Sequence, residues 1–379
     1  MKKNVKIIVS ALCLIISTII AMSACASSAP VKSIEYTELG IPLAAQYTDG
    51  VRARCPWDMI LFKNRLYVGG GDYDSNAGPV NVCYYDLNTS QWVCEGTVDD
   101  EEINRFCLIN GSLVIPGTDP RGNGIYGQFY TLEQDQWKTT QSIRGGLHNF
   151  DMVAYNGMVF AGLGVASGES PIVCSLDGGQ TFSPVDMVKD GIPVDTSESA
   201  LVRVYDLFIL NDSLYAAFRY GETEITYDLY KFQNGVFVFD NQWYQKIHQI
   251  RYTSNIIGGK AEFKGQLFFT TGYLYATSDM ANFTRVVLPN NETVYDLYAE
   301  NDCLYALCGA PQENGGFEIS VWANHTGEPT RFTELFRFAY DIPPISMVYR
   351  DGDIYIGMGD FQTSHDKNGM ILHIQYKKE

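Results

Sequence analysis

The residues with the clearest capacity for chemistry are aspartates and an arginine at equivalent places in a repeated segment. Seven segments each contain an apolar run, a short polar turn and a second apolar run, as in VYDLFILNDSLYAAF at 204–218. Eight residues before the first large apolar residue after each turn stand Asp58, Arg105, Asp151, Asp206, Gly259, Asp296 and Ser346. Together these positions would form a polar, mostly acidic pocket for a hydrogen-bonding ligand. Alternatively, the repeated aspartate bonds the backbone of the neighbouring repeat, a solution that repeated units share.

Two cationic side chains lie three residues further upstream, His148 and Arg203. They belong to adjacent repeats and could receive a carboxylate or another anionic group. A solvated loop histidine is the ordinary alternative. The long connection 242–256 adds residues suited to stacking on a sugar and bonding its hydroxyls: Trp243, Tyr244, His248, Arg251 and Tyr252. We therefore predict a ligand site built from Asp58, Arg105, His148, Asp151, Arg203, Asp206 and Asp296.

A metal site is a weaker hypothesis. Asp72, Asp74 and Asn76 alternate as at the start of a calcium loop. The glycine comes one place late, however, and Cys83 stands where such a loop has its glutamate. A polar turn explains the pattern, so no cofactor is predicted, with Ca²⁺ at these three residues as the alternative.

The repeats also predict the architecture. Their marker residues lie 37 to 55 residues apart, and each unit is typical of a β-hairpin. Seven such units predict an all-β, seven-bladed β-propeller. The segment 36–39 (YTEL) nearly repeats 332–335 (FTEL), whereas MILHIQY at 370–376 has no outer strand after it. We therefore expect the N-terminal strand to complete the last blade and close the propeller.

One hairpin carries a known motif. Its residues are Ser175, Asp177, Gly179, Thr181 and Phe182. This pattern resembles the Asp-box, or BNR repeat, of sialidases and other propellers, and diluted copies such as YDLNTSQW at 85–92 look more like kelch repeats. The resemblance implies the fold and a structural role for Asp177. The sialidase Arg-Ile-Pro motif is missing, since 40–42 and 191–193 read Gly-Ile-Pro, so the resemblance assigns no catalytic residue.

Two cysteines are predicted to form a disulfide. Placing Tyr85 opposite Trp92 across a hairpin also places Cys83 opposite Cys94. Directly opposed residues of an antiparallel pair are close enough for a disulfide after modest adjustment.

The N-terminus has the pattern of a secretory signal. Lysines at 2, 3 and 6 precede an apolar run from 7 to 22. The following Ser23-Ala24-Cys25 resembles the bacterial lipobox, in which the cysteine becomes the lipidated first residue of the mature protein. This implies a signal peptide at 1–24, a lipidated tether at 25–33 and a propeller domain at 34–379. Ordinary cleavage with an incidental Cys25 is the alternative. We expect an extracytoplasmic protein bound to membrane lipid through acylated Cys25.

The net negative charge of the chain disfavours nucleic acid as a partner. Without 1–24 the chain has 24 basic and 44 acidic residues, and such a surface repels nucleic acid. The favoured function is a non-catalytic, membrane-anchored lipoprotein that binds a glycan or other extracellular ligand at the channel mouth. Two alternatives remain: a glycan-active hydrolase or lyase that uses the aspartates with His148 and Arg203, and a scaffold for envelope proteins.

Overall fold

The computed structural model describes residues 34–121, 126–166, 168–197, 202–220, 226–242, 259–289 and 292–376. The chain divides into two units, Met1–Ser33 and Ile34–Glu379, and every described residue belongs to the second. The signal segment 1–24, Cys25, the tether 25–33 and nearly all of the connection 242–256 lie outside the described residues. Within the described part, no helix is long and apolar enough to cross a membrane.

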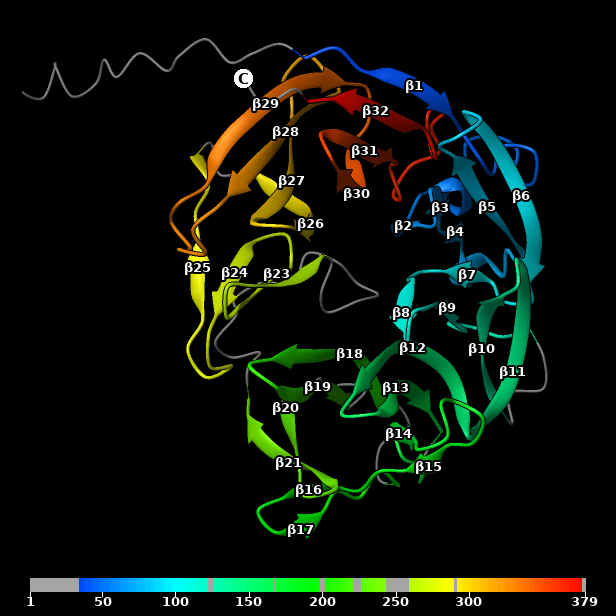
Figure 1. Ribbon diagram of the computed structural model, residues 1–379, viewed down its shortest axis with the longest axis vertical. Coiled ribbons are helices and arrows are strands. Elements are labelled where there is room, and N and C mark those ends of the chain that lie inside the picture. Colours follow the sequence, from blue (N-terminus) through cyan, green and yellow to red (C-terminus); the bar gives the residue numbers. More distant parts are fainter. Residues whose placement is uncertain are drawn as a thin grey trace, which may run out of the picture. The chain divides into compact units, whose positions relative to one another are not determined.

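The second unit is all-β, and its described helices are two short 3-10 turns, η1 (Arg52–Arg54) and η2 (Tyr73–Ser75). Its strands form small sheets that follow one another around a common centre in a propeller-like arrangement (Figure 1). Five of the sheets have four strands each.

The five four-stranded sheets are numbered first to fifth in chain order. The first contains β2 (Met59–Phe62), β3 (Arg65–Val68), β5 (Val80–Asp86) and β6 (Gln91–Val98). The second contains β8 (Cys107–Ile109), β9 (Ser112–Pro116), β10 (Tyr126–Glu133) and β11 (Gln136–Arg144). The third contains β22 (Lys260–Phe263), β23 (Gln266–Thr270), β24 (Leu274–Thr277) and β25 (Thr284–Val286). The fourth contains β26 (Thr293–Glu300), β27 (Cys303–Pro311), β28 (Phe317–Asn324) and β29 (Thr333–Tyr340). The fifth contains β30 (Pro344–Arg350), β31 (Asp353–Met358), β32 (Ile371–Gln375) and, outermost, β1 (Thr37–Gly40).

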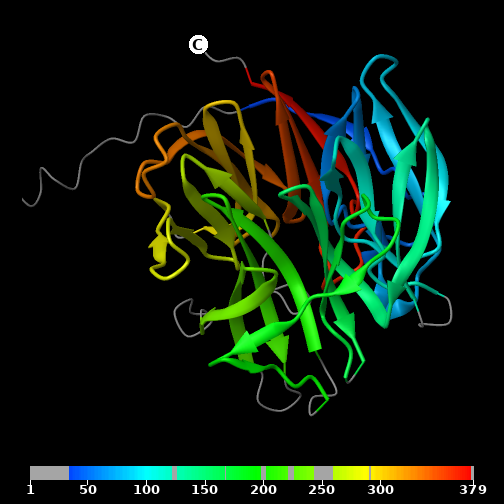
Figure 2. The ribbon, with the colours of Figure 1, turned by 60° about the horizontal axis from the view of Figure 1, so that its bottom comes forward.

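Between the second and third of these sheets lies a single ten-stranded sheet, green in Figure 1 and turned toward the viewer in Figure 2. One half contains β12 (Gly146–Tyr155), β13 (Met158–Val165), β14 (Ile172–Ser175) and β15 (Ser183–Pro184). The other contains β18 (Val202–Leu210), β19 (Ser213–Tyr220), β20 (Thr226–Gln233) and β21 (Val236–Asn241), with β16 (Met187–Lys189) and β17 (Ile192–Pro193) at its edge. A two-stranded sheet pairs β4 (Gly70–Gly71) with β7 (Glu102–Ile103).

The strands nearest the common centre are β2, β8, β12, β18, β22, β26 and β30 (Figure 1). We call these the inner strands. The mouth is the face of the propeller-like unit at which the inner strands begin.

The number of separate blade sheets is therefore five rather than the seven expected. The difference arises where β13 pairs with β18, through Gly164 opposite Arg203 and Val165 opposite Val202. The ladder between β13 and β14 ends at Gly162, so the last residues of β13 are open to the start of β18. This pairing merges two expected blades into one sheet.

The first and last described strands pair in one sheet. Thr37 and Glu38 of β1 pair with His373 and Leu372 of β32. The indole of Trp92, on β6, donates to the Leu39 carbonyl over 2.8 Å. The N-terminal strand thus contacts both the fifth sheet and the first.

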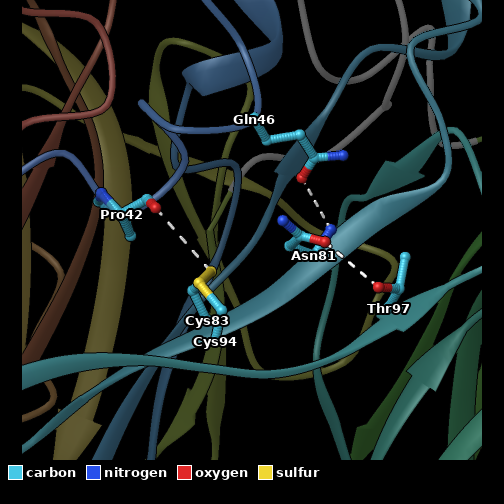
Figure 3. Close-up of a disulfide and its surroundings, with 6 residues drawn as sticks. All are labelled: Pro42, Gln46, Asn81, Cys83, Cys94 and Thr97. Carbon is cyan, nitrogen blue, oxygen red and sulfur yellow. Dashed lines mark hydrogen bonds between the residues drawn. A yellow bond between two sulfur atoms is a disulfide. The ribbon is translucent and has the colours of Figure 1, made fainter.

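Figure 3 shows the cysteines on the second hairpin of the first sheet. Cys83 pairs with Cys94 and Tyr85 with Trp92, and the structure joins the two cysteines in a disulfide. Beside it, the Gln46 side-chain oxygen accepts the Asn81 N–H over 2.9 Å (Figure 3). These contacts fix the segment that follows β1 onto β5.

The Asp-box residues form a self-contained turn. One Asp177 oxygen accepts the N–H groups of Gln180 and Thr181, each over 2.9 Å, and Thr181 Oγ1 donates to the other over 2.6 Å. Hydrogen bonds from Thr181 lower the pKa of Asp177 below its usual range. Phe182 packs edge-on against Phe129 of the preceding sheet. The motif therefore has a local structural role, outside the centre.

Candidate functional site

The structure places the predicted aspartates where neighbouring inner strands meet at the mouth. Asp58 Oδ2 accepts the Phe106 N–H over 2.7 Å, which links the first sheet to the second. Asp151 Oδ2 accepts the Leu207 N–H over 2.9 Å, and Asp296 Oδ2 accepts the Met347 N–H over 2.7 Å. Three of the four aspartates thus bond the backbone of the next inner strand, within it at Leu207 and Met347 or just before it at Phe106. This is the scaffold role that the repetition offered as an alternative.

The other positions of the repeat complete this scaffold. Ser346 Oγ donates to the Pro56 carbonyl over 2.6 Å and joins the fifth sheet to the first. At Gly259 an added Cβ would collide with the Leu297 backbone and the Asp296 carboxylate, which explains the glycine. Burial raises the pKa of Asp58 to about 6, and burial together with the charge of Asp58 raises that of Asp296 to about 8.

Arg105 lies in what we call the paired cluster, with Asp151, Asp206 and Lys260. Its Nη1 and Nη2 lie 2.8 Å from an Asp151 oxygen and 2.9 Å from an Asp206 oxygen. Lys260 Nζ also bonds the Asp151 carboxylate and lies 3.4 Å from Asp206. Burial alone would raise the pKa of Asp151, but the charges of Arg105 and Lys260 outweigh it and lower that pKa. Two cations face two carboxylates, so the cluster neutralises itself.

His148 and Arg203 belong to a second group, which we call the cationic row. Gly164 of β13 pairs with His148 of β12 on one side and with Arg203 of β18 on the other. Arg203 in turn pairs with Arg219 of β19. An added Cβ at Gly164 would lie 2.8 Å from both His148 Cδ2 and Arg203 Cδ. The two side chains therefore converge over the glycine, and three potential cations stand in one line across four strands.

Two β-bulges supply aromatic neighbours to the cationic row. The register of β12 shifts between Asn149 and Asp151, and that of β18 shifts between Val204 and Asp206. The extra residues are Phe150 and Tyr205, whose ring centroids lie 4.5 Å apart. His148 stacks on Phe150 at 5.4 Å, and the Arg203 guanidinium lies 6.0 Å from the same ring. Bulges re-aim side chains in this way beside functional sites.

The cationic row is only partly balanced, because the one carboxylate described beside it, Asp119, acts on both His148 and Arg203. Within the described part of the chain, neither Arg203 nor Arg219 has a carboxylate oxygen within 4.0 Å. Arg219 donates to Tyr205 Oη over 3.2 Å, but its buried Nε has no described hydrogen-bond partner. Burial and the adjacent charge of Arg219 lower the pKa of Arg203. With two arginines and one nearby aspartate, the row keeps an excess of positive charge.

The histidine of the row has one nitrogen engaged. His148 Nδ1 lies 2.7 Å from the Thr118 carbonyl, an acceptor, so Nδ1 carries a hydrogen. The same nitrogen lies 3.5 Å from an Asp119 oxygen. Burial and the charge of Arg203 lower the pKa of His148, although Asp119 opposes them. An anion bound beside the imidazole would reverse this shift.

The side chains of the calcium-loop hypothesis are engaged in other contacts. Asp72 caps η2 by accepting the Asp74 N–H over 3.2 Å and the Ser75 hydroxyl over 2.7 Å. Asp74 forms a 2.7 Å ion pair with Arg52, and Asn76 closes the turn in the left-handed conformation. Among the described residues, no group of three or more His, Cys, Asp or Glu side chains could hold a metal ion.

One residue of each cluster was missed by the sequence analysis. Arg219 becomes the neighbour of Arg203 only because the bulge at Tyr205 changes the pairing register. Lys260 directly follows Gly259, so an inspection of the residues beside the repeat position could have found it.

No protein-family model and no curated protein matches the sequence. Among solved structures, the polysaccharide lyase Uly1 matches with a TM-score of 0.49 and 9% identity, covering 91% of this chain and 99% of that one. Sqt1 of Saccharomyces cerevisiae matches with a TM-score of 0.46 and 12% identity, covering 92% and 100%. The extracellular domain of the proposed one-component system BT4673 from B. thetaiotaomicron matches with a TM-score of 0.44 and 10% identity. That match covers 80% of this chain, which spans 44% of the length of the BT4673 domain. These likenesses are remote and assign no function to this chain.

Proposed function

We propose that this chain is an extracytoplasmic lipoprotein whose β-propeller binds an anionic ligand at the mouth, with an acidic glycan as the ligand class. The observation that carries the proposal is the cationic row, in which Arg203 and Arg219 stand side by side with no described carboxylate oxygen within 4.0 Å, and Asp119 acts on Arg203 from further away. Two adjacent guanidinium groups are well suited to a carboxylate, sulfate or phosphate group, because they offer fixed pairs of N–H donors. A bound anion would neutralise the row as the two aspartates neutralise Arg105 and Lys260.

The aromatic residues define the rest of the ligand. Phe150 and Tyr205 are half-buried and in contact, next to the two arginines. Aromatic faces and a hydroxyl suit the apolar faces and hydroxyl groups of a sugar ring. An acidic sugar offers both features in one unit, which favours it over a small inorganic anion.

The geometry favours binding over catalysis. A glycosidase needs a pair of carboxylates free to serve as acid and as base or nucleophile. Here Asp58, Asp151 and Asp296 accept backbone N–H groups of the next sheet, and Asp206 is paired with Arg105. No described contact singles out an acid–base pair among them, so the glycan-active enzyme is the second candidate.

The propeller is proposed to have seven blades, with β12–β15 and β18–β21 as two blades fused through β13 and β18. The pairing of β1 with β32 supports closure of the propeller by the N-terminal strand. The anchor is proposed to be acylated Cys25. Replacing it, in Cys25→Ala, should release the protein from membranes, and unchanged membrane association would contradict the anchor.

The ligand class can be tested with one chemical change. Oligogalacturonate and its methyl ester differ in charge but keep the same sugar backbone. Isothermal titration of the purified domain should detect binding of the acid and much weaker binding of the ester, and added salt should weaken binding of the acid. Equal affinity for the two would show that charge does not determine recognition and would overturn the proposal.

A further inference from the structure

A second concave site lies at the opposite end of the unit from the mouth. It is a pocket of about 450 Å³ between the fifth sheet and the first. Its lining comes from the ends of β5, β30 and β32 and from the turns beside them, where the inner strands finish rather than begin. The volume falls within the range of about 300–1,000 Å³ that small-molecule pockets occupy. None of the repeat positions that form the mouth lines it.

One wall of this pocket is aromatic and held in place. Tyr355 and His373 are cross-strand partners on β31 and β32, and their rings stack 4.8 Å apart with an angle of 12° between their planes. His373 Nε2 also lies 2.8 Å from an Asp353 oxygen. Tyr355 is buried, whereas the His373 side chain keeps 21% of its surface exposed. A second half-buried ring, Tyr85, completes the wall from the first sheet.

The rim of the pocket offers both donors and acceptors. Arg350 is 40% exposed, and its described carboxylate contact is a loose one, 3.8 Å to the 81% exposed Asp351. Asn88 is exposed in the turn between β5 and β6, and Asp86 Oδ1 fixes that turn by accepting the Asn88 N–H over 2.8 Å. Asp353, 41% exposed, is the acceptor nearest the aromatic wall. The rim therefore presents hydrogen-bond donors and acceptors beside the aromatic wall.

The charges of this pocket differ from those of the mouth. One arginine stands against two aspartates, so the pocket has no excess of positive charge. Stacking rings with a rim of amide, carboxylate and guanidinium groups are the chemistry that recognises an uncharged, polyhydroxylated ring. From this we infer that the pocket between β32 and β5 is a separate binding site for a neutral saccharide unit. It is independent of the anionic site at the mouth.

The inference is tested with uncharged sugars on the whole domain. The probes are glucose, galactose, mannose, N-acetylglucosamine and their disaccharides, at concentrations up to about 10 mM to cover weak binding. Saturation-transfer NMR and titration should detect at least one of them. Arg350→Ala should weaken that binding by about tenfold, the effect of losing a hydrogen bond from a charged group, and Asn88→Ala by about fivefold, the effect of losing a neutral one. Both side chains are exposed, so the fold should survive.

Two matched variants distinguish this pocket from a sugar site elsewhere on the domain. Asp302→Ala changes a 98% exposed residue in the turn between β26 and β27 of the fourth sheet, which corresponds to the turn between β30 and β31 beside Arg350. This variant should leave sugar binding unchanged. Arg203→Ala, at the mouth, should also leave neutral-sugar binding unchanged while weakening acidic ligands. The inference is wrong if no neutral sugar of the panel binds. It is equally wrong if binding persists at full strength in both Arg350→Ala and Asn88→Ala. Loss of neutral-sugar binding in Arg203→Ala would show that these sugars bind at the mouth and not in this pocket.

Discussion

Two clusters of charged side chains lie close to the mouth, and they differ in how their positive charge is balanced. In the paired cluster, Arg105 and Lys260 meet the buried carboxylates of Asp151 and Asp206. In the cationic row, Arg203 and Arg219 meet each other, with a histidine and two aromatic rings around them. Both clusters contain an arginine that the repeats single out. Only the row has positive charge left for a ligand.

The difference between the clusters shows how a repeated fold can obtain an asymmetric site. The paired cluster uses positions that recur in the repeats, where a carboxylate bridges neighbouring inner strands. The cationic row depends instead on the irregular pairing of β13 with β18, which places Arg203 directly beside Gly164. The departure from separate blades and the unbalanced charge therefore occur at the same strands. We infer that the fusion of the two blades is what positions the site.

The largest expected effect concerns the paired cluster. Arg105→Ala should leave two buried carboxylates with only Lys260 to balance them. Removing one partner of a buried ion pair typically costs about 3–5 kcal/mol of unfolding free energy. Urea unfolding followed by tryptophan fluorescence would measure the loss.

Arg203→Ala provides the contrast, since it removes no described ion pair and should change the unfolding free energy by no more than about 0.5 kcal/mol. If Arg105→Ala unfolds at the wild-type urea concentration but loses ligand affinity, Arg105 belongs to the binding site and the distinction between the two clusters fails.

A second prediction concerns the glycine of the row. Gly164→Ala would add a Cβ 2.8 Å from both His148 Cδ2 and Arg203 Cδ. Both side chains must move, which should cost about 1–3 kcal/mol of stability and also weaken anion binding. Gly96→Ala, at a β6 glycine whose added Cβ would meet only Trp137 Cδ1 at 3.6 Å, an ordinary contact distance, is a control for the loss of a strand glycine. Unchanged ligand affinity in a folded Gly164→Ala variant would show that the convergence over Gly164 does not matter for binding.

The smallest effect concerns pH. The pKa of His148 is lowered in the free protein, so its imidazole is neutral at pH 7. A bound anion would raise this pKa, and protons are then taken up on binding. Affinity should therefore rise by up to about fivefold as the pH falls from 7.5 toward 5.5. The rise should disappear in His148→Gln, and a pH-dependent gain that persists in that variant would assign it to another group.

The fold was predictable to the extent that it depends on local pattern. Asn-Gly and Asn-Asp turns adopt positive φ at Asn156, Gly157, Asn211 and Asp212, and such turns determine where the hairpins form. The pairing of Cys83 with Cys94 likewise follows from the register of its own hairpin. The merging of β13 with β18 could not be predicted. Both segments have the pattern of ordinary strands, and the sequence does not show that β13 continues past its ladder with β14 and pairs with the start of β18.

The candidate site was predictable only in part. His148 and Arg203 were identifiable because they occupy equivalent positions in adjacent repeats. Arg219 was not, since a register without the bulge at Tyr205 would place Arg203 opposite Tyr220 instead. The role of Arg105 was also hidden, because the sequence does not show that its position faces two aspartates and that Lys260 faces them as well.

The most direct test of binding by the cationic row is a titration of oligogalacturonate against the wild type, Arg203→Ala, Arg219→Ala and the double variant. Each single variant should weaken binding by about 1.5–3 kcal/mol, the range for a hydrogen bond to a charged group, with little change in melting temperature. The two effects should not add, because the two guanidinium groups are adjacent and would hold the same anion. Wild-type affinity in both single variants, with the fold intact, would contradict the claim that the cationic row binds the ligand.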